Sequence, residues 1–317
     1  MHRTSRQQHR FARPLRQGIV AGACLLLSAC AAPDPIVLLD ADETRDSAYG
    51  TDGPLGALLE QRTIRVRVDE TVNTDITVPT DADGAALSGP LPTIVLLPGG
   101  AVQSDRYRWL AAHFASRGFV VVAPYFDTFS LFEVGNVVAV LDHVKDLAER
   151  PEDALYEAID PEVPVMITGH SLGGVTSSKV WLDLPEEVTH LAFLASTTDA
   201  NDDFSTRPDP TGTAAVLTVT GEMDGRVEPE TVSEGVEGFS IPVTGALVAG
   251  MNHLQWADDV TEKEAENDYV ATISEDEARY LGLYLVDALA DDFANGTQGV
   301  LDAPESWPEG LTTLELP

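Results

Sequence analysis

Cysteine is almost missing from this chain. Its 317 residues include only Cys24 and Cys30, both close to the N-terminus. A cut before Cys30 would leave one cysteine, so no disulfide could form within the remaining chain, although exported proteins often use them. A single cysteine at a new N-terminus is consistent with a lipid attachment site.

Basic residues are scarce as well. The chain has 19 Lys and Arg against 52 Asp and Glu, for a formal net charge of −33. Because nucleic acids and anionic lipid headgroups are negatively charged, such a surface repels both. We therefore expect no nucleic-acid partner and no direct binding to an anionic membrane. Hydrophobic residues still make up 44% of the chain, which is enough for a sizeable core.

The N-terminus has the features of a signal peptide. Residues 1–16 carry five arginines and no acid, and the apolar run at 18–27 is too short to span a bilayer comfortably. Residues 27–30, Leu-Ser-Ala-Cys, resemble the lipobox of bacterial lipoproteins, in which the cysteine receives a diacylglyceryl group and becomes the first mature residue. By this resemblance, residues 1–29 are a lipoprotein signal peptide and Cys30 is the lipidation site. The alternative is an ordinary secretory signal with an incidental Cys30.

The lipoprotein interpretation predicts an exported protein that is held to the bacterial cell envelope. Contact with the membrane would be made through the Cys30 lipid only, without a spanning segment. Ala31, and not an aspartate, follows the cysteine. In the resembled lipoproteins of Gram-negative bacteria, this residue favours location in the outer membrane. The oligomeric state stays open.

The remaining chain alternates between buried strands and amphipathic helices. Residues 30–60 are rich in Asp, Ala, Gly and Pro and predict a tether, whereas 61–317 show no repeat and no second apolar core, and predict a single domain. Strands are expected at 64–68, 75–78, 93–97, 119–123, 163–168, 190–194, 214–220 and 243–248, and helices at 107–116, 134–150, 173–184 and 275–291. This order predicts an α/β fold with a mostly parallel central sheet and helices on both faces.

One motif indicates a nucleophile. Residues 169–173, Gly-His-Ser-Leu-Gly, match G-x-S-x-G directly after a predicted strand and directly before a predicted helix. So tight a turn leaves no room for side chains two residues before and two after Ser171, which explains the glycines. The turn exposes Ser171 at the end of the strand, and the N–H of Leu172 becomes available to a developing oxyanion.

A serine needs a base and an acid to become a nucleophile, and in this arrangement they follow it in the order acid, then histidine. His253 is the base by elimination, because it alone follows the last predicted strand. His2 and His9 lie in the predicted signal peptide, and His113 and His143 precede the serine. His170 belongs to the turn of the motif, the nucleophile elbow, and His190 directly follows the helix after the serine. Asp224, in a glycine-flanked turn just past a strand, is the expected acid, and Glu222 is the competitor.

The second oxyanion donor is expected in the loop after the first buried central strand, at residues 97–101. Gly100 is the first choice and Ala101 the second. We interpret two other features near the predicted site as structural. The Asp- and Pro-rich segment 197–213 is expected to be a solvated loop, the alternative being a cover over the site. Trp256 is expected to pack against its own loop, the alternative being a wall of the cleft.

Residues 90–258 resemble the α/β-hydrolase superfamily, in the branch of cutinase-like and polyester hydrolases, chlorophyllase-like proteins and dienelactone-hydrolase-like esterases. Residues 91–100 and 110–124 carry the likeness together with the serine, acid and histidine motifs. The resemblance implies hydrolysis of a small-molecule or lipid-like ester through an acyl-enzyme, without a metal or organic cofactor. Residues 194–199 lack the tryptophan of cutinase-like polyesterases, and dienelactone hydrolases proper use cysteine at the elbow. A generic carboxylesterase is therefore expected.

Two other functions remain open at this point. A hydrolase-fold lipoprotein can lose catalysis and act in binding, and the same fold also supports peptidases and acyltransferases. The acyl and alcohol groups of the substrate are not specified by the sequence.

Overall fold

The computed structural model describes residues 37–39, 49–100, 102, 104–125, 134–156, 158–206, 208–209, 212, 214–296 and 299–317. The predicted signal peptide, Cys30 and Ala101 lie outside these ranges. All described residues belong to one compact unit.

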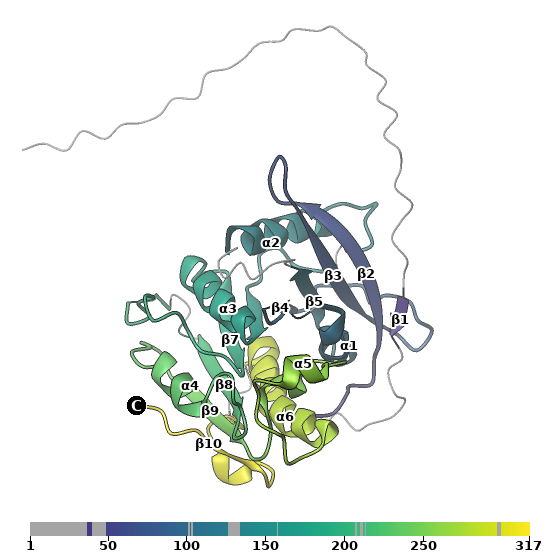
Figure 1. The fold of residues 1–317 in the computed structure, drawn as a ribbon. Coiled ribbons are helices and arrows are strands. Elements are labelled where there is room, and N and C mark those ends of the chain that lie inside the picture. The colour runs from purple at the N-terminus through teal and green to yellow at the C-terminus, as the bar shows by residue number, and fades with distance from the viewer. Residues whose placement is uncertain are drawn as a thin grey trace, which may run out of the picture. The chain divides into compact units, whose positions relative to one another are not determined.

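The described strands form one sheet of ten, in the order β1-β2-β3-β5-β4-β6-β7-β8-β9-β10 (Figure 1). Their bounds are β1 Val37–Leu39, β2 Gly56–Arg65, β3 Thr71–Thr80, β4 Thr93–Leu97, β5 Val120–Tyr125, β6 Val165–His170, β7 Val188–Leu194, β8 Ala215–Gly221, β9 Val243–Val248 and β10 Leu311–Thr313. The six strands from β5 to β9 in this order are parallel, and the strands at both edges are antiparallel. The predicted mostly parallel sheet is confirmed.

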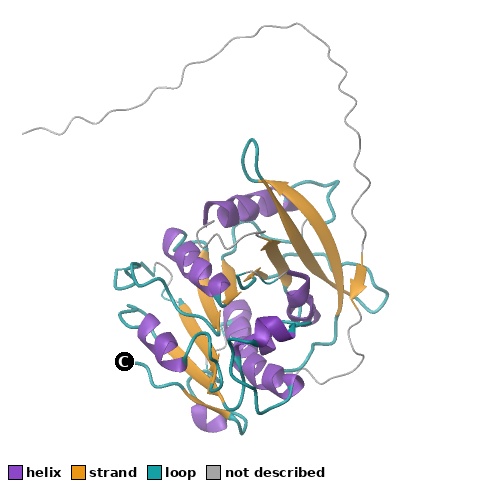
Figure 2. Ribbon diagram, in the orientation of Figure 1, coloured by secondary structure: helices purple, strands orange, loops and turns teal. Residues whose placement is uncertain are grey.

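Helices cover both faces of the sheet (Figure 2). Their bounds are α1 Arg108–Ser116, α2 Val134–Ala148, α3 Leu172–Asp183, α4 Pro229–Gly235, α5 Glu262–Ala265 and α6 Glu275–Asn295, with short 3-10 turns η1 Ser104–Tyr107, η2 His253–Trp256 and η3 Pro304–Ser306. Alternate side chains of β4 point to opposite faces of the sheet. Ile94 and Leu96 pack in the cluster that contains α1 and α6, whereas Val95 and Leu97 pack in the cluster of α2 and α3. Burial on both faces explains why the central strands are continuous apolar runs.

The hairpin before the central strands is longer than the sequence pattern predicts. β2 begins at Gly56, inside the range 30–60 that was assigned to the tether, and it pairs with β3 along its whole length, from Gly56 opposite Thr80 to Arg65 opposite Thr71. Ala57 and Leu59 both point into the core, but Leu58 between them is apolar too, so the alternation is hidden in the sequence. The predicted strand at 64–68 keeps only its first two residues.

In the part of the chain that the structure describes, no helix combines the length and the apolar character that a membrane span requires.

Candidate active site

Ser171 lies between the end of β6 and the start of α3, in a strained backbone conformation. Its φ is 53° and its ψ is −124°, a region that residues with a side chain rarely adopt and that costs about 1–3 kcal/mol. Two hydrogen bonds hold the turn in place. The Ser171 amide donates to the carbonyl of Leu194 at 3.0 Å, and the Ser196 hydroxyl donates to the Ser171 carbonyl at 2.6 Å.

The glycines of the motif are required by close backbone contacts. A Cβ on Gly169 would lie 2.3 Å from the carbonyl carbon of Gly173. A Cβ on Gly173 would lie 2.2 Å from the carbonyl oxygen of Leu97, because the first turn of α3 crosses the end of β4. The pattern in the sequence therefore reflects the steric demand of a strand that turns directly into a helix.

His253 and Asp224 are brought together at the same end of the sheet. His253 begins η2 after β9, and its Nδ1 lies 2.9 Å from Oδ2 of Asp224, which follows β8. Both side chains are buried. The other carboxylate oxygen of Asp224 accepts hydrogen bonds from the amides of Arg226 and Val227, at 2.9 and 2.8 Å, so its orientation is fixed. Since a carboxylate can only accept, Nδ1 of His253 carries the proton and Nε2 is left as a base.

The two candidate acids point in different directions. Oε2 of Glu222 accepts a hydrogen bond from the amide of Gly250 at 3.0 Å, and its side chain is exposed. Asp224, two residues later, is buried and meets the imidazole. Of the two acids considered from the sequence, the structure therefore pairs Asp224 with His253.

The elbow and the His253 loop touch through His170, the residue before Ser171. The His170 and His253 rings have centroids 4.6 Å apart, and Nε2 of His170 donates to the backbone carbonyl of His253 at 3.0 Å. Burial is the main cause that holds the pKa of His170 well below its ordinary value, and electrostatic repulsion from the His253 ring and from Arg226 acts in the same direction. His170 is therefore a neutral neighbour of the His253 imidazole.

The two predicted oxyanion donors are also adjacent. A Cβ on Gly100 would lie 2.2 Å from Cδ1 of Leu172, so the loop after β4 packs directly on the first residue of α3. The neighbouring Gly99 amide is already engaged, since it donates to the Tyr107 hydroxyl at 3.1 Å. The N–H of Leu172 lies at the positive end of the α3 dipole, where negative charge is stabilised.

Residues 93–280 match the profile of a family described as the alpha/beta hydrolase family. The match covers more than half of the 317 residues. The chain belongs to this family. The predicted α/β-hydrolase fold is thereby confirmed, and the serine, acid and histidine discussed above all lie within the matched range. Comparison with curated proteins gives no significant match.

In this α/β hydrolase, sequence reasoning missed a carboxylate that connects the two loops of the acid and the histidine. Asp268, in the segment between α5 and α6, accepts from the amide of Gly225 at 2.9 Å and from the amide of Leu254 at 3.1 Å. These are the residues that directly follow Asp224 and His253. No motif marks Asp268 in the sequence, where it is one of many acids.

Two segments that were predicted near the site of the hydrolase, 197–213 and the loop of Trp256, are both held by contacts with the rest of the fold. The start of 197–213 is anchored, because Thr197 donates to the carbonyl of Thr231 at 3.1 Å and Lys179 pairs with Asp202 at 2.9 Å. Trp256 is fully buried, and a Cβ on Gly282 of α6 would lie 2.6 Å from its ring. Packing of the Trp256 loop, expected from the sequence, is confirmed.

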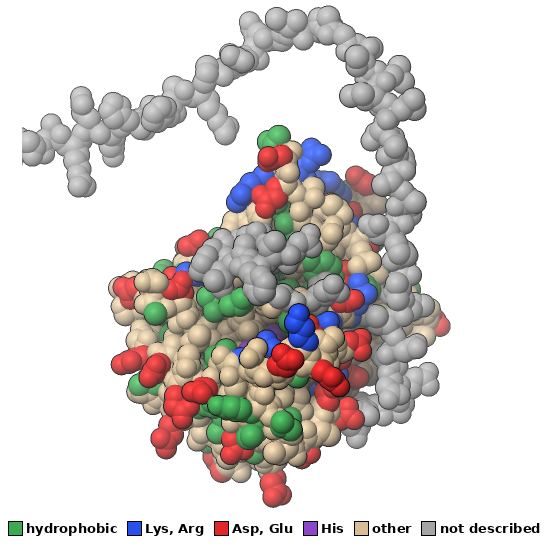
Figure 3. All heavy atoms as spheres, in the orientation of Figure 1, with side chains coloured by type: hydrophobic (Ala, Val, Ile, Leu, Met, Phe, Trp, Pro, Cys, Tyr) green, Lys and Arg blue, Asp and Glu red, His purple; other side chains and the backbone are tan. Residues whose placement is uncertain are grey.

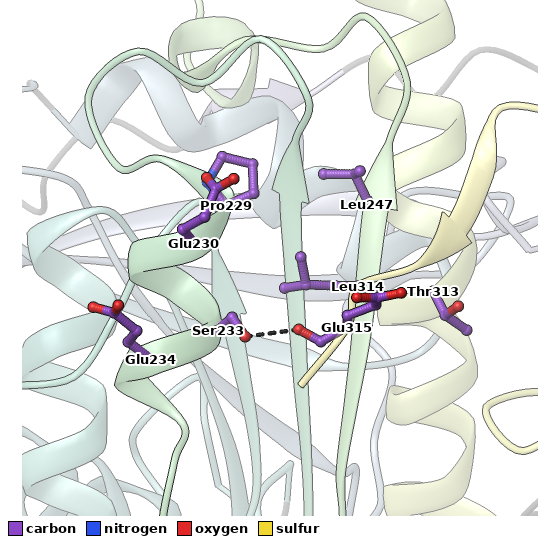
Figure 4. Close-up of a pocket in the computed structure, with 8 residues that line it drawn as sticks. All are labelled: Pro229, Glu230, Ser233, Glu234, Leu247, Thr313, Leu314 and Glu315. Carbon is purple, nitrogen blue, oxygen red and sulfur yellow. Dashed lines mark hydrogen bonds between the residues drawn. The ribbon is translucent and has the colours of Figure 1, made fainter. Parts of the chain in front are cut away.

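A hollow of the hydrolase lies between α4, β9 and the C-terminal segment (Figure 4). It has a volume of about 460 Å³, and its lining includes Glu230, Glu234 and Glu315 but no basic side chain and none of the predicted catalytic residues. Acidic side chains are also spread around the face of the molecule that Figure 3 shows. The hollow therefore does not complement an anionic ligand.

Proposed function

We propose that this α/β hydrolase is a serine carboxylic-ester hydrolase with Ser171 as nucleophile, His253 as base and Asp224 as the acid that orients it. The observation that carries the proposal is the buried hydrogen bond between Asp224 and His253, on a loop that contacts the strained serine elbow through His170. A buried carboxylate with three hydrogen bonds is suited to hold one imidazole tautomer and to stabilise the imidazolium.

The proposed reaction proceeds through an acyl-enzyme. Ser171 Oγ attacks the ester carbonyl while Nε2 of His253 accepts its proton, and the N–H groups of Leu172 and Gly100 stabilise the oxyanion. The C–O bond to the alcohol then breaks, and the alcohol leaves with the proton from His253. Water repeats the sequence on the acyl group, releases the carboxylic acid and restores Ser171.

The substrate and the location belong to the same proposal. We expect small or medium acyl esters, including lipid-like ones, and an exported protein anchored to the bacterial cell envelope by a lipid on Cys30. Incorporation of radiolabelled fatty acid, and recovery in the membrane fraction, should both be lost in Cys30→Ala. Lipid labelling that survives this substitution would exclude Cys30 as the attachment site.

The activity is tested with a fluorophosphonate probe, which reacts only with activated serines, and with p-nitrophenyl esters of rising acyl length. Labelling and turnover of the full chain should disappear in Ser171→Ala and persist in Ser306→Ala, an exposed serine of η3. A folded wild-type protein without labelling or turnover would contradict the proposal and favour a binding role. Labelling without ester turnover would favour a peptidase or acyltransferase instead.

A further inference from the structure

A buried chain of hydrogen bonds joins three loops around Ser171. The Gly99 amide donates to the Tyr107 hydroxyl at 3.1 Å, and that hydroxyl lies 2.7 Å from Nδ1 of His170. Nε2 of His170 lies 3.0 Å from the backbone carbonyl of His253. Tyr107 is 2% exposed and His170 is 0% exposed, so water does not compete for these bonds.

The chemistry of the atoms gives the chain one direction. A carbonyl oxygen only accepts, so Nε2 of His170 must carry a proton and donate to His253. Because His170 is neutral, its Nδ1 has a free lone pair and accepts from the Tyr107 hydroxyl. The phenol oxygen in turn accepts from Gly99. Every donor therefore meets an acceptor, and both nitrogens of His170 are occupied.

This arrangement separates His170 from proton transfer. With one nitrogen donating to a backbone carbonyl and the other accepting from a phenol, the ring has no site left for the Ser171 proton. What it does connect is the backbone of the loop after β4, the elbow and the loop that begins at His253. A Cβ on Gly99 would lie 2.9 Å from both the Tyr107 hydroxyl and Nδ1 of His170, which shows how closely that loop rests on the pair.

We propose that Tyr107 and His170 are positioning residues that hold the loop after β4 and the loop that begins at His253 in register with Ser171. The inference rests on the proposed ester hydrolysis. Small displacements of groups that stabilise the transition state cost more in rate than in substrate binding. Loss of these hydrogen bonds should therefore lower kcat while KM changes little.

Tyr107→Phe is the first test, because it keeps the buried ring and removes only the hydroxyl. Steady-state hydrolysis of a p-nitrophenyl ester by the full chain should show kcat lowered by about tenfold, with KM within about twofold of wild type. Tyr284→Phe is the matched control. Tyr284 lies on α6 against the ring of Tyr49 and takes no part in the hydrogen bonds described above. Removal of its hydroxyl should leave kcat and KM unchanged.

The second test compares His170→Gln with His170→Leu. Glutamine can accept from Tyr107 with its oxygen and donate to the His253 carbonyl with its nitrogen, and it does not titrate. We expect His170→Gln to retain most of kcat and His170→Leu to lose about tenfold or more. A residue with only a packing role would show no advantage of glutamine over leucine.

The outcomes separate the two proposals. A wild-type protein without labelling or turnover removes the proposed function itself. An active wild type whose Tyr107→Phe variant keeps its kcat overturns the positioning role, even if stability falls. An equal loss in His170→Gln and His170→Leu, in folded proteins, overturns the hydrogen-bonding explanation. If the His170 variants do not fold, Tyr107→Phe decides.

Discussion

His113 provides a test of how buried charge stabilises this fold. The imidazole, on α1, is almost fully buried between two carboxylates. Nδ1 lies 2.9 Å from Oδ1 of Asp52 and Nε2 lies 2.8 Å from Oδ1 of Asp287 on α6, whose other oxygen accepts from the amide of Gly50 at 2.7 Å. The cluster therefore fastens the chain that precedes β2 to two helices on one face of the sheet.

The size of the effect follows from the pKa of His113. Burial is the largest single influence and lowers this pKa, but the charges and hydrogen bonds of Asp287 and Asp52 together outweigh it and raise the pKa from 6.5 to about 9. A group whose pKa is raised in the folded state stabilises it fully below its unfolded pKa and loses this contribution as pH rises through the folded value. The shift corresponds to about 3 kcal/mol, present below pH 6.5 and lost by about pH 9 to 10.

Urea denaturation of wild type and His113→Gln from about pH 6 to about pH 10 measures this contribution. The difference in unfolding free energy between the two proteins should shrink by about 3 kcal/mol across that range, because glutamine does not titrate. His143→Gln is the matched control. The pKa of His143 on α2 is lowered from 6.5, mainly by burial, so from about one pH unit above that value His143 is neutral in both states and should add no slope over the rest of the range. Parallel curves for wild type and His113→Gln would refute the reasoning.

Three further predictions concern the site. Asp224→Asn should lower kcat for ester hydrolysis by about 10³- to 10⁴-fold, whereas Glu222→Gln should leave it unchanged; equal losses would mean that the hydrogen bond to the imidazole is not the decisive feature. Gly173→Ala should destabilise the fold by about 3 kcal/mol or more in urea titrations, because the added Cβ meets the end of β4. Gly135→Ala at the start of α2 is the control and should be neutral or stabilising by up to about 1 kcal/mol. Asp268→Ala should lower kcat by about 10- to 100-fold with a smaller loss in Asp268→Asn, which keeps one accepting oxygen; steady-state rates that match wild type would exclude a role for this bridge.

The elbow was predictable from the sequence because most of its causes are local. Gly169 is required by the backbone of Gly173 and Gly174 within the same turn, and β6 and α3 have their own periodicity on either side. Gly173 is the exception, since the carbonyl of Leu97 at the end of β4 leaves no room for a side chain there. The central strands were predictable for a similar reason, since burial on both faces writes a continuous apolar run into each of them. The hairpin was not, because β2 is defined by its pairing with β3 and only part of it alternates clearly.

Other parts of the site depend on contacts between residues that are far apart in the chain. Elimination selected His253 from the sequence and position favoured Asp224, but residue type alone could not separate Asp224 from Glu222, two acids of one short turn. Only the fold decides which of them faces the imidazole and which faces the amide of Gly250. Likewise, nothing in the sequence indicates that Asp268 spans the loops of the acid and the base.

The sequence by itself therefore determined the nucleophile turn, the alternation of the central strands with the main helices, and the candidate base. The tertiary structure alone decided the partners of these groups, because side-chain direction at the edge of a sheet depends on how neighbouring loops pack. The clearest case is the chain from Gly99 through Tyr107 and His170 to His253, whose side-chain contacts bridge 63 and 83 positions of sequence. Such contacts depend on how the strands align in the folded protein, and no local pattern indicates them.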